Sequence, residues 1–207
     1  MRIGPKYKIA RRLGDSIFEK TRTQRYALVE GKKKANIQKR KKHRSNFTEY
    51  GIQFLEKQKI RFSYGITERQ LANYVAKAKT SRKGSPTEET FRMLELRLDN
   101  VLYRLGIAPT RQFGRQAINH GHVTINGQKM DVASYQVKIG EIVGVKAKSK
   151  EGGLVRGRKE ALKEYSTPSW LLLDPETLTG TVKSLPKMGE HESNLNFGLV
   201  VQFYSRV

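Results

Sequence analysis

The chain has 207 residues and contains 41 Lys and Arg against 19 Asp and Glu, which gives a formal net charge of +22 at pH 7. A surplus of this size predicts a polyanionic partner, and nucleic acid fits better than a membrane surface because the sequence shows neither a basic helix with a broad apolar face nor a lipidation signal. The lack of cysteine excludes disulfides, cysteine-ligated zinc and thiol catalysis, and the lack of a long apolar run or a leader-like start predicts a cytoplasmic protein without membrane contact.

Residues 1–47 are predicted to be a basic RNA-binding arm. Residues 1–50 hold 16 Lys or Arg against four acidic residues, and their apolar residues follow no sustained period, so we expect little core there. The stretch GKKKANIQKRKKHR, residues 31–44, is typical of a segment that is disordered alone and orders on RNA. A flexible tail without a specific role is the alternative. The cations predicted to contact RNA are Arg2, Lys6, Lys8, Arg11, Arg12, Lys41, Lys42 and Arg44.

Residues 48–92 are predicted to form a helical body. In its first helix Phe54 is expected to face inward, while Lys57, Lys59 and Arg61 are long enough to reach phosphates. Tyr50 is a candidate for stacking on a base, although a tyrosine at helical spacing is more often a core residue.

The second helix of this body begins at a predicted capping box of Thr67 and Gln70. Apolar residues then recur at helical spacing over residues 71–78. Arg69 and Asn73 lie four apart on one side of this helix and are predicted to contact RNA. The alternative is an ordinary solvated face.

A domain boundary is expected near residues 83–85, within SRKGSPTEETF. Ser85 is a predicted cap, Pro86 fits the first helical position and Glu88 completes a second capping box. One long helix is expected over residues 86–105, ended by Gly106. Residues 93–182 are assigned to a second domain.

The second domain contains a short helix with one apolar and one cationic face. Thr110 is its predicted cap, and residues 113, 117 and 118 form the inward face. Arg111 and Arg115 lie four apart on the other face, where two guanidiniums can meet successive phosphates. Gln116 lies on the same outward side.

Small strands are predicted after this helix. Residues 123–125 lead into Asn126-Gly127, the dipeptide of a type I′ hairpin turn, and a further strand pair is expected around residues 137–145. The polar residues predicted to contact RNA here are His120, His122, Lys129, Tyr135 and Gln136. His120 and His122 have no cysteine or carboxylate nearby to complete a metal site, so no metal or cofactor is expected.

The carboxyl-terminal third is predicted to hold a short basic helix and more strands. The helix is expected over residues 154–164, and a buried strand over residues 170–173 is stopped by Asp174-Pro175. Apolar residues alternate over residues 195–204, which predicts a strand with one apolar face. That face includes Leu199, Val201 and Phe203, and it must dock on the chain itself or on a partner protein.

The segments RLDNVLYRLG, TRQFGRQAINHGHVTINGQ and VASYQVKIGE resemble the S-four RNA-binding module, in which two helices and a small sheet hold a basic helix face against RNA. The flanking segments YGIQFLEKQKIRFSYGITERQLANY, PSWLLLDPETLTGTV and NFGLVVQFYS extend this resemblance to the S-four family of small-subunit ribosomal proteins over nearly the whole chain. The resemblance implies an α+β fold: a mostly helical amino-terminal body, a module of two helices on a mainly antiparallel sheet, and a carboxyl-terminal segment, residues 183–207, that returns to the body and completes it.

The resemblance also implies a function and partners. Family members bind the five-prime domain of small-subunit rRNA, nucleate assembly, and support translational accuracy together with protein S-five. The arginines of the short helix, residues 120–122 and residues 135–136 match positions that face RNA. Messenger RNA is an implied neighbour where it enters the ribosome; Lys42 and Arg44 fit that role, whereas Asn46 departs from the basic pattern. Some relatives carry zinc-binding cysteines in the arm, which this chain lacks.

Two other functions were weighed against this one. An RNA-modifying enzyme such as a pseudouridine synthase needs a catalytic domain with an aspartate nucleophile, and the residues outside the module are too few and too basic for one. Asp99 and Asp131 have simpler roles as a partner for a neighbouring Arg and as a turn residue. A stand-alone RNA-binding factor would keep the module but lack the helical body. The sequence therefore predicts a non-catalytic rRNA-binding protein.

Overall fold

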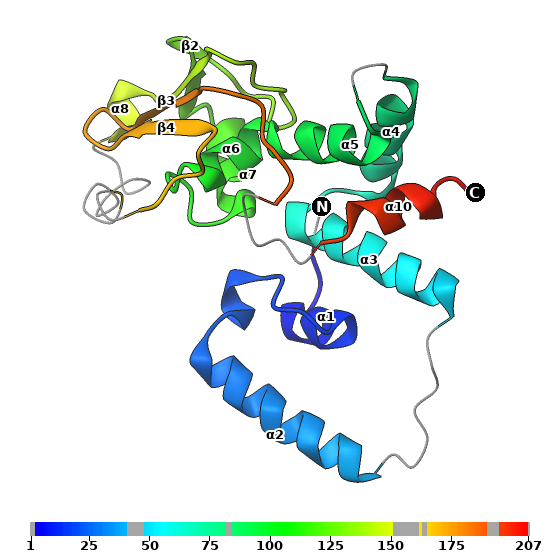
Figure 1. Ribbon diagram of the computed structural model, residues 1–207. Coiled ribbons are helices and arrows are strands. Elements are labelled where there is room, and N and C mark those ends of the chain that lie inside the picture. The colour runs from blue at the N-terminus through cyan, green and yellow to red at the C-terminus, as the bar shows by residue number, and fades with distance from the viewer. Residues whose placement is uncertain are drawn as a thin grey trace. The chain divides into compact units, whose positions relative to one another are not determined.

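The computed structural model describes residues 3–40, 48–81, 84–150, 162, 165–189 and 195–206 (Figure 1). The chain divides into two compact units, one of Met1–Thr80 with Asn194–Val207 and one of Ser81–Ser193. The first unit is helical, and the second combines helices with a five-stranded antiparallel sheet. The predicted α+β class is confirmed.

The amino-terminal part of the first unit has a small core, which the sequence analysis did not expect. Ala10, Leu13 and Phe18 are buried, and the ring of Phe18 meets that of Phe62 edge to face at 6.4 Å between centroids. The elements here are α1 (Lys6–Leu13), the 3-10 helix η1 (Glu19–Thr21) and α2 (Gln24–Arg40).

The prediction that residues 31–44 are disordered alone is wrong as far as Arg40, where helix α2 ends. Residues 41–44 lie outside the described residues. Ala, Lys, Gln and Arg fill most of the second half of α2, and these residues have high helix propensity, so a helix forms where the charge pattern alone indicates disorder.

Helices α3 (Glu49–Tyr64) and α4 (Glu68–Thr80) form the rest of the body. Between them the predicted capping box is confirmed, because the amide of Gln70 donates to Thr67 Oγ1 (3.3 Å) and the amide of Thr67 donates to Gln70 Oε1 (3.0 Å). The buried core of the two helices includes Ile60, Tyr64, Leu71 and Val75.

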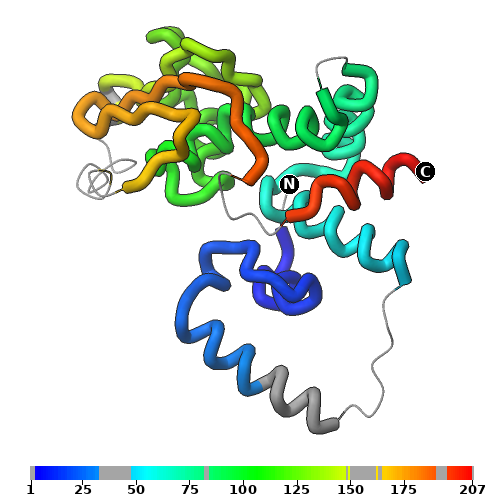
Figure 2. Tube along the Cα trace, in the orientation of Figure 1, coloured from blue at the N-terminus to red at the C-terminus, as the bar shows by residue number. Residues whose placement is uncertain are grey.

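The predicted carboxyl-terminal strand is wrong: residues Phe197–Phe203 form helix α10. Asn196 caps it by accepting a hydrogen bond from the amide of Leu199 (3.1 Å). Phe197, Val200 and Phe203 are buried at a spacing of three, which fits one face of a helix. In Figure 2 the red segment of α10 runs alongside the cyan segment of α3. The segment thus returns to the body, as the fold prediction has it, but as a helix.

The predicted long helix over residues 86–105 is two helices, α5 (Pro86–Glu95) and α6 (Leu98–Arg104). Arg97 interrupts it with an extended backbone, φ −62° and ψ 136°, and pairs with Gln136 in an isolated antiparallel bridge. Pro86 occupies the first turn of α5 as predicted, but the Ser85 side chain makes no capping hydrogen bond, so the second capping box is not formed.

The sheet of the second unit has the strand order β2-β1-β3-β5-β4. Asn126 (φ 51°) and Gly127 (φ 81°) both have positive φ, which confirms the type I′ turn between β1 and β2. The strands are β1 (Val123–Ile125), β2 (Gln128–Lys129), β3 (Ile142–Val145), β4 (Leu171–Asp174) and β5 (Thr179–Val182).

The predicted local strand pair over residues 137–145 is only half correct. Strand β3 pairs with β1 and β5, while the amide of Val137 donates to the carbonyl of Leu96 (2.9 Å) at the break between α5 and α6. Helix α7 (Arg111–Asn119) and the short α8 (Ala147–Lys150) complete this unit. The predicted helix over residues 154–164 lies outside the described residues except for Leu162.

The division into units also differs from the predicted boundaries. Residues 81–92, predicted as body, group with the second unit, and the described part of the predicted arm groups with the first. Residues 183–189 also belong to the second unit, where the amide of Lys183 donates to the carbonyl of Trp170 (2.9 Å).

Candidate nucleic-acid interface

Helix α7 is fixed against α6 by its cap and its small residues. Thr110 Oγ1 accepts a hydrogen bond from the amide of Phe113 (3.1 Å). Gly114, Ala117 and Ile118 are buried on its inner face. A Cβ at Gly114 would lie 3.0 Å from the Asp99 carbonyl oxygen, a tight contact that a larger residue could make only if the neighbouring backbone shifted. The outer side of α7 therefore has a set position.

Arg115, on that outer side, is held by a buried carboxylate. Its Nε donates to Asp99 Oδ2 (3.0 Å), and Asp99 is only 1% exposed. The same carboxylate accepts from Arg97, with Nε on Oδ1 (3.0 Å) and Nη2 on Oδ2 (2.8 Å). One buried negative charge thus serves two guanidiniums, and the expectation that Asp99 pairs with a neighbouring Arg is confirmed.

Arg111 is positioned through an amide rather than directly by a carboxylate. Its Nε donates to Asn100 Oδ1 (2.7 Å), and its guanidinium carbon lies 4.5 Å from the centroid of the Tyr103 ring. Asn100 Nδ2 in turn donates to Glu95 Oε2 (3.0 Å). Glu95 also accepts two hydrogen bonds from Arg104, at 2.8 Å each, so a continuous network runs from Arg104 to Arg111.

The whole cluster carries an excess of positive charge at the protein surface. Buried carboxylates are costly unless cations and hydrogen bonds compensate them, and here Glu95 and Asp99 are both fully compensated. The four arginines of the network outnumber its two carboxylates. Arg111 and Arg115 are half-buried at the rim, so part of this permanent positive charge lies at the surface, where it suits a phosphate group.

Other predicted residues extend this rim at the carboxyl-terminal end of α7. Gln116, His120 and Lys129 are exposed, and Lys129 passes over Gly121. The His120 and His122 rings lie 6.0 Å apart, and His122 Nδ1 lies 2.9 Å from Ser149 Oγ. These residues lie near the same end of α7, and RNA contact by them stays a prediction.

Tyr135 and Gln136 are half-buried and take part in internal contacts. The Tyr135 hydroxyl donates to Glu141 Oε1 (2.8 Å), and this hydrogen bond, followed by burial, raises the pKa of Tyr135. Gln136 Nε2 donates to the carbonyl of Met93 (3.0 Å). Their polar groups hold the loop before β3, and RNA contact by either residue stays a prediction.

In the first unit, α4 presents the predicted row. Arg69 and Asn73 are exposed one turn apart, and Lys77 continues the row. On α3, Lys59 pairs with Glu56, and the guanidinium of Arg61 lies 4.6 Å from the centroid of the Phe62 ring.

The burial of Lys57 argues against the RNA contact predicted for it. It is 6% exposed, and its Nζ donates to Glu68 Oε1 (2.7 Å) and lies 4.3 Å from the centroid of the Phe203 ring. The Tyr204 hydroxyl donates to the same carboxylate oxygen (2.6 Å). The face of α3 that carries Lys57 is covered by α10, so this lysine is a structural ion-pair partner.

The pKa values in this cluster follow from its contacts. Burial alone raises the pKa of the Glu68 carboxyl. The hydrogen bonds from Lys57 and Tyr204 and the positive charges of Lys57 and Arg61 outweigh burial and leave the pKa below its ordinary value. Burial first, and then the hydrogen bond to Glu68, raise the pKa of the Tyr204 hydroxyl.

The surface role of Tyr50 and of α10 also needs revision. Tyr50 is 56% exposed, yet its ring packs on Phe54 and Phe203, at 6.4 Å and 5.4 Å between centroids. Phe203 is buried in this aromatic group. Since a helix turns about 100° per residue, Leu199 and Val201 point in different directions, and the predicted common face of Leu199, Val201 and Phe203 does not exist.

The described arm cations differ in their contacts. Lys8 and Arg12 are exposed, whereas Arg11 Nε donates to Glu30 Oε2 (3.2 Å) and Lys6 Nζ lies 5.8 Å from the centroid of the Phe18 ring. The remaining predicted contacts, Arg2, Lys41, Lys42 and Arg44, lie outside the described residues.

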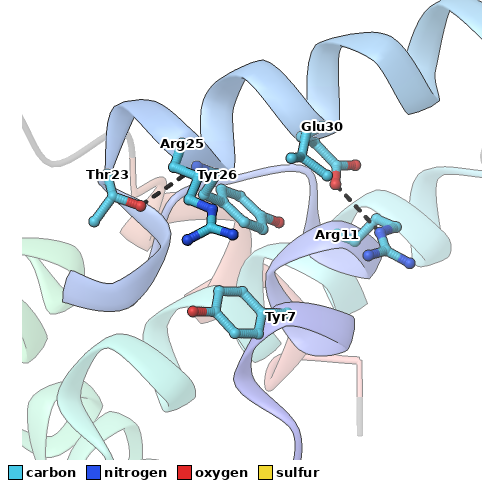
Figure 3. A pocket seen from close by; sticks show the side chains of 7 residues that line it. Tyr7, Arg11, Thr23, Arg25, Tyr26 and Glu30 are labelled. Atoms are coloured by element: carbon cyan, nitrogen blue, oxygen red, sulfur yellow. Dashed lines mark hydrogen bonds and ion pairs between the residues drawn. The ribbon is translucent and has the colours of Figure 1, made fainter.

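The residues that support the arginines of α7 were not predicted from the sequence. Asn100 and Glu95 link Arg111 to Arg104. The only hint of this network in the sequence is the presence of acidic residues within a basic segment. Also not predicted was a pocket between α1 and α2 that contains Tyr7, Arg25 and Tyr26 (Figure 3). The adjacent residues Arg25 and Tyr26 within a basic arm could have indicated this pocket, because a cation beside an aromatic ring is typical of nucleotide-binding sites.

Among the described residues, no three His, Asp or Glu side chains are grouped closely enough to hold a metal ion. None of the helices in the described segments has both the length and the apolar character needed to cross a bilayer.

Comparison with known proteins identifies the family. Residues 1–95 match the ribosomal protein S4/S9 N-terminal domain, and residues 96–143 match the S4 domain. The chain is 41% identical over 204 residues to small ribosomal subunit protein uS4 of Chromobacterium violaceum, covering 99% of this chain and 98% of the relative. The chain belongs to the uS4 family. Proteins of the same name from Listeria monocytogenes serotype 4b and Pediococcus pentosaceus are 40% and 38% identical, each covering 98% of the relative and 98% and 99% of this chain.

Membership in the uS4 family decides between the alternatives from the sequence. The match extends through the helical body as well as the module, which a stand-alone factor would not share. The uS4 family is structural and non-enzymatic, which decides against an RNA-modifying enzyme.

Proposed function

We propose that this chain binds small-subunit rRNA as a structural, non-enzymatic component of the cytoplasmic small ribosomal subunit. The observation that carries the proposal is the network in which buried Asp99 and Asn100 hold Arg115 and Arg111 at the surface of α7. Near-complete coverage of uS4 relatives supports it, because both domains of those proteins are present.

Pre-positioned arginines favour recognition of backbone and shape. Their side chains are already ordered by internal contacts, so binding RNA costs less side-chain entropy than it would for solvated lysines. Structured RNA exposes mainly phosphates and sugars to such groups. Each neutralised phosphate releases counterions, so affinity should fall steeply as the salt concentration rises.

The finer partners follow from the resemblance to the S-four family. We propose that the RNA is the five-prime domain of small-subunit rRNA and that binding nucleates assembly of the subunit. We further propose that protein S-five, and messenger RNA near the channel through which it enters the ribosome, are neighbours of this chain. With α10 as a helix, a protein contact there would use the half-buried Leu199 or Val201 separately and not a shared apolar face.

The test is binding of the full chain to naked small-subunit rRNA, measured with footprinting at several salt concentrations. The variant Arg111→Ala/Arg115→Ala is expected to lose a few kcal/mol of binding, at about 1.5–3 kcal/mol for each charge-assisted contact. The matched control Lys183→Ala/Lys187→Ala removes the same charge from exposed positions in the same unit and should cost much less. Equal affinities and footprints for the two double variants would remove α7 from the interface.

A further inference from the structure

A pocket lies between α1 and α2, apart from the α7 network. Its volume is about 300 Å³, at the lower end of the range for small-ligand sites. Side chains from both helices line it: Tyr7, Arg11, Thr23, Arg25, Tyr26, Val29 and Glu30 (Figure 3).

Local contacts fix both ends of this pocket. At one end Thr23 Oγ1 accepts a hydrogen bond from the amide of Tyr26 (3.4 Å), which starts α2 and sets Tyr26 in its first turn. The Tyr26 ring then stacks on Tyr7 of α1, with 5.5 Å between centroids and 23° between planes. At the other end Arg11 pairs with Glu30 (3.2 Å). The pocket is therefore held open by one aromatic and one ionic contact.

The pocket offers two kinds of unused binding surface. Tyr7 is 49% exposed although it stacks on Tyr26, so part of its ring still faces the solvent. Arg25 is exposed, and among the described residues no hydrogen bond or ion pair to its side chain is found. Since Glu30 compensates Arg11, the charge of Arg25 is the net charge of the pocket.

An aromatic face beside an uncompensated guanidinium matches a nucleotide. A base stacks on the ring and a phosphate pairs with the cation. A carboxylate-bearing peptide would use the cation but leave the ring without a partner. A base inside a duplex has both faces covered, so only an unpaired nucleotide can present a face to Tyr7.

We propose that this pocket takes one unpaired nucleotide of the bound RNA, with its base against Tyr7 and its phosphate on Arg25. The inference rests on the rRNA-binding function proposed above and adds a second, stacking contact in the other unit. Tyr50 does not offer the same site, because its ring already packs on Phe54 and Phe203.

The first experiment is zero-length ultraviolet crosslinking of the full wild-type chain to small-subunit rRNA, followed by mass spectrometry of the peptides. We expect a nucleotide adduct on Tyr7 or Tyr26. This readout requires no substitution, so it does not depend on the folding of a variant.

The second experiment compares the rRNA affinities of variants over a range of salt concentrations. Tyr7→Leu should bind about 5- to 150-fold more weakly, the range for loss of one stacked base, with the salt slope unchanged because stacking releases no counterions. Tyr7→Phe keeps the ring and should stay near wild type. Arg25→Gln should weaken binding, make the salt slope shallower by about 0.7 to 0.9, and abolish the adduct.

Lys20→Gln is the matched control, because it removes one exposed charge of η1, outside the pocket, and should leave the adduct intact. The absence of an adduct on both tyrosines, together with a Tyr7→Leu affinity within about twofold of wild type, would overturn the inference and leave rRNA binding standing. Failure of the wild-type chain to bind rRNA at all would instead overturn the proposed function.

Discussion

Each of the two units contains a cluster of cations and carboxylates. The two clusters differ in which partner of the ion pair, the acid or the base, is the more deeply buried. In the second unit the carboxylate of Asp99 is buried and Arg115 lies at the rim. In the first unit Lys57 is buried and the side chain of Glu68 is 43% exposed. The first arrangement leaves positive charge at the surface, whereas the second keeps it inside the unit. A basic residue at a helical position thus indicates RNA contact only when no other element covers its face.

The covering element explains the difference. Helix α10 lies on the face of α3 that carries Lys57, so the ammonium group is surrounded by aromatic rings and needs a carboxylate nearby. The outer side of α7 leaves Arg111 and Arg115 half-buried at the surface, where their guanidiniums are held from below.

Removing the buried carboxylate of the second unit should have the largest effect. Asp99→Ala leaves Arg97 buried without its counter-charge, and we expect a loss of about 3–5 kcal/mol in the free energy of unfolding. Trp170 is the only tryptophan of the chain and is buried in this unit, so its fluorescence during urea unfolding gives the measurement. The exposed Asp131→Ala is the control, expected within about 0.5 kcal/mol of wild type. Similar values for the two variants would contradict the role assigned to Asp99.

Acid should destabilise the first unit through Glu68. Because the folded-state pKa of Glu68 lies below its ordinary value of 4.5, its contribution to stability is present above that value and is lost as the pH falls through the lowered pKa. The opening equilibrium of α3 and α10 peptides is obtained by dividing each hydrogen-exchange rate by the intrinsic rate at the same pH. From about pH 6 to about pH 3 this equilibrium should increase less steeply in Glu68→Gln than in wild type.

Glu49→Gln, which alters an exposed ion pair with Arg206, serves as the control for the acid experiment and should keep the wild-type pH dependence. If Glu68→Gln showed the same acid response as wild type, another carboxylate would have to carry the pH dependence.

Replacing the buried Lys57 should have little effect on rRNA affinity, in contrast to replacing Arg115. Lys57→Met replaces a buried ammonium by an apolar chain of similar length, so we expect stability within about 1 kcal/mol and rRNA affinity within about twofold of wild type. Arg115→Met should lower the affinity about tenfold or more. Binding titrations of the two variants under one salt condition provide the measurement. A loss of affinity in Lys57→Met as large as in Arg115→Met would return Lys57 to the interface.

Much of the second unit could be predicted because its signals are local. The Asn126-Gly127 turn, the Thr110 cap and the spacing of Arg111 and Arg115 depend on residues within a few positions of one another, and the structure has all three. The predicted outward face of α7 was correct for the same reason.

The errors arose where distant segments compete with local pattern. The alternation over residues 195–204 fits a strand, but the buried spacing of Phe197, Val200 and Phe203 fits the surface of α3, about 140 residues away, as in the contact between Asn196 and Glu56. Helix propensity would carry α5 through Arg97, yet pairing with Gln136 and Asp99 breaks it.

Net charge, turn chemistry and helical period are properties of neighbouring residues, so they were enough to predict a polyanionic partner, the hairpin and the cationic side of α7, while the family resemblance supplied the α+β class. Three features could be read only from the folded chain: Lys57 lies inside, α10 is a helix, and Glu95 and Asp99 hold the surface arginines in place. Burial depends on which distant element covers a face, and no local pattern records that choice.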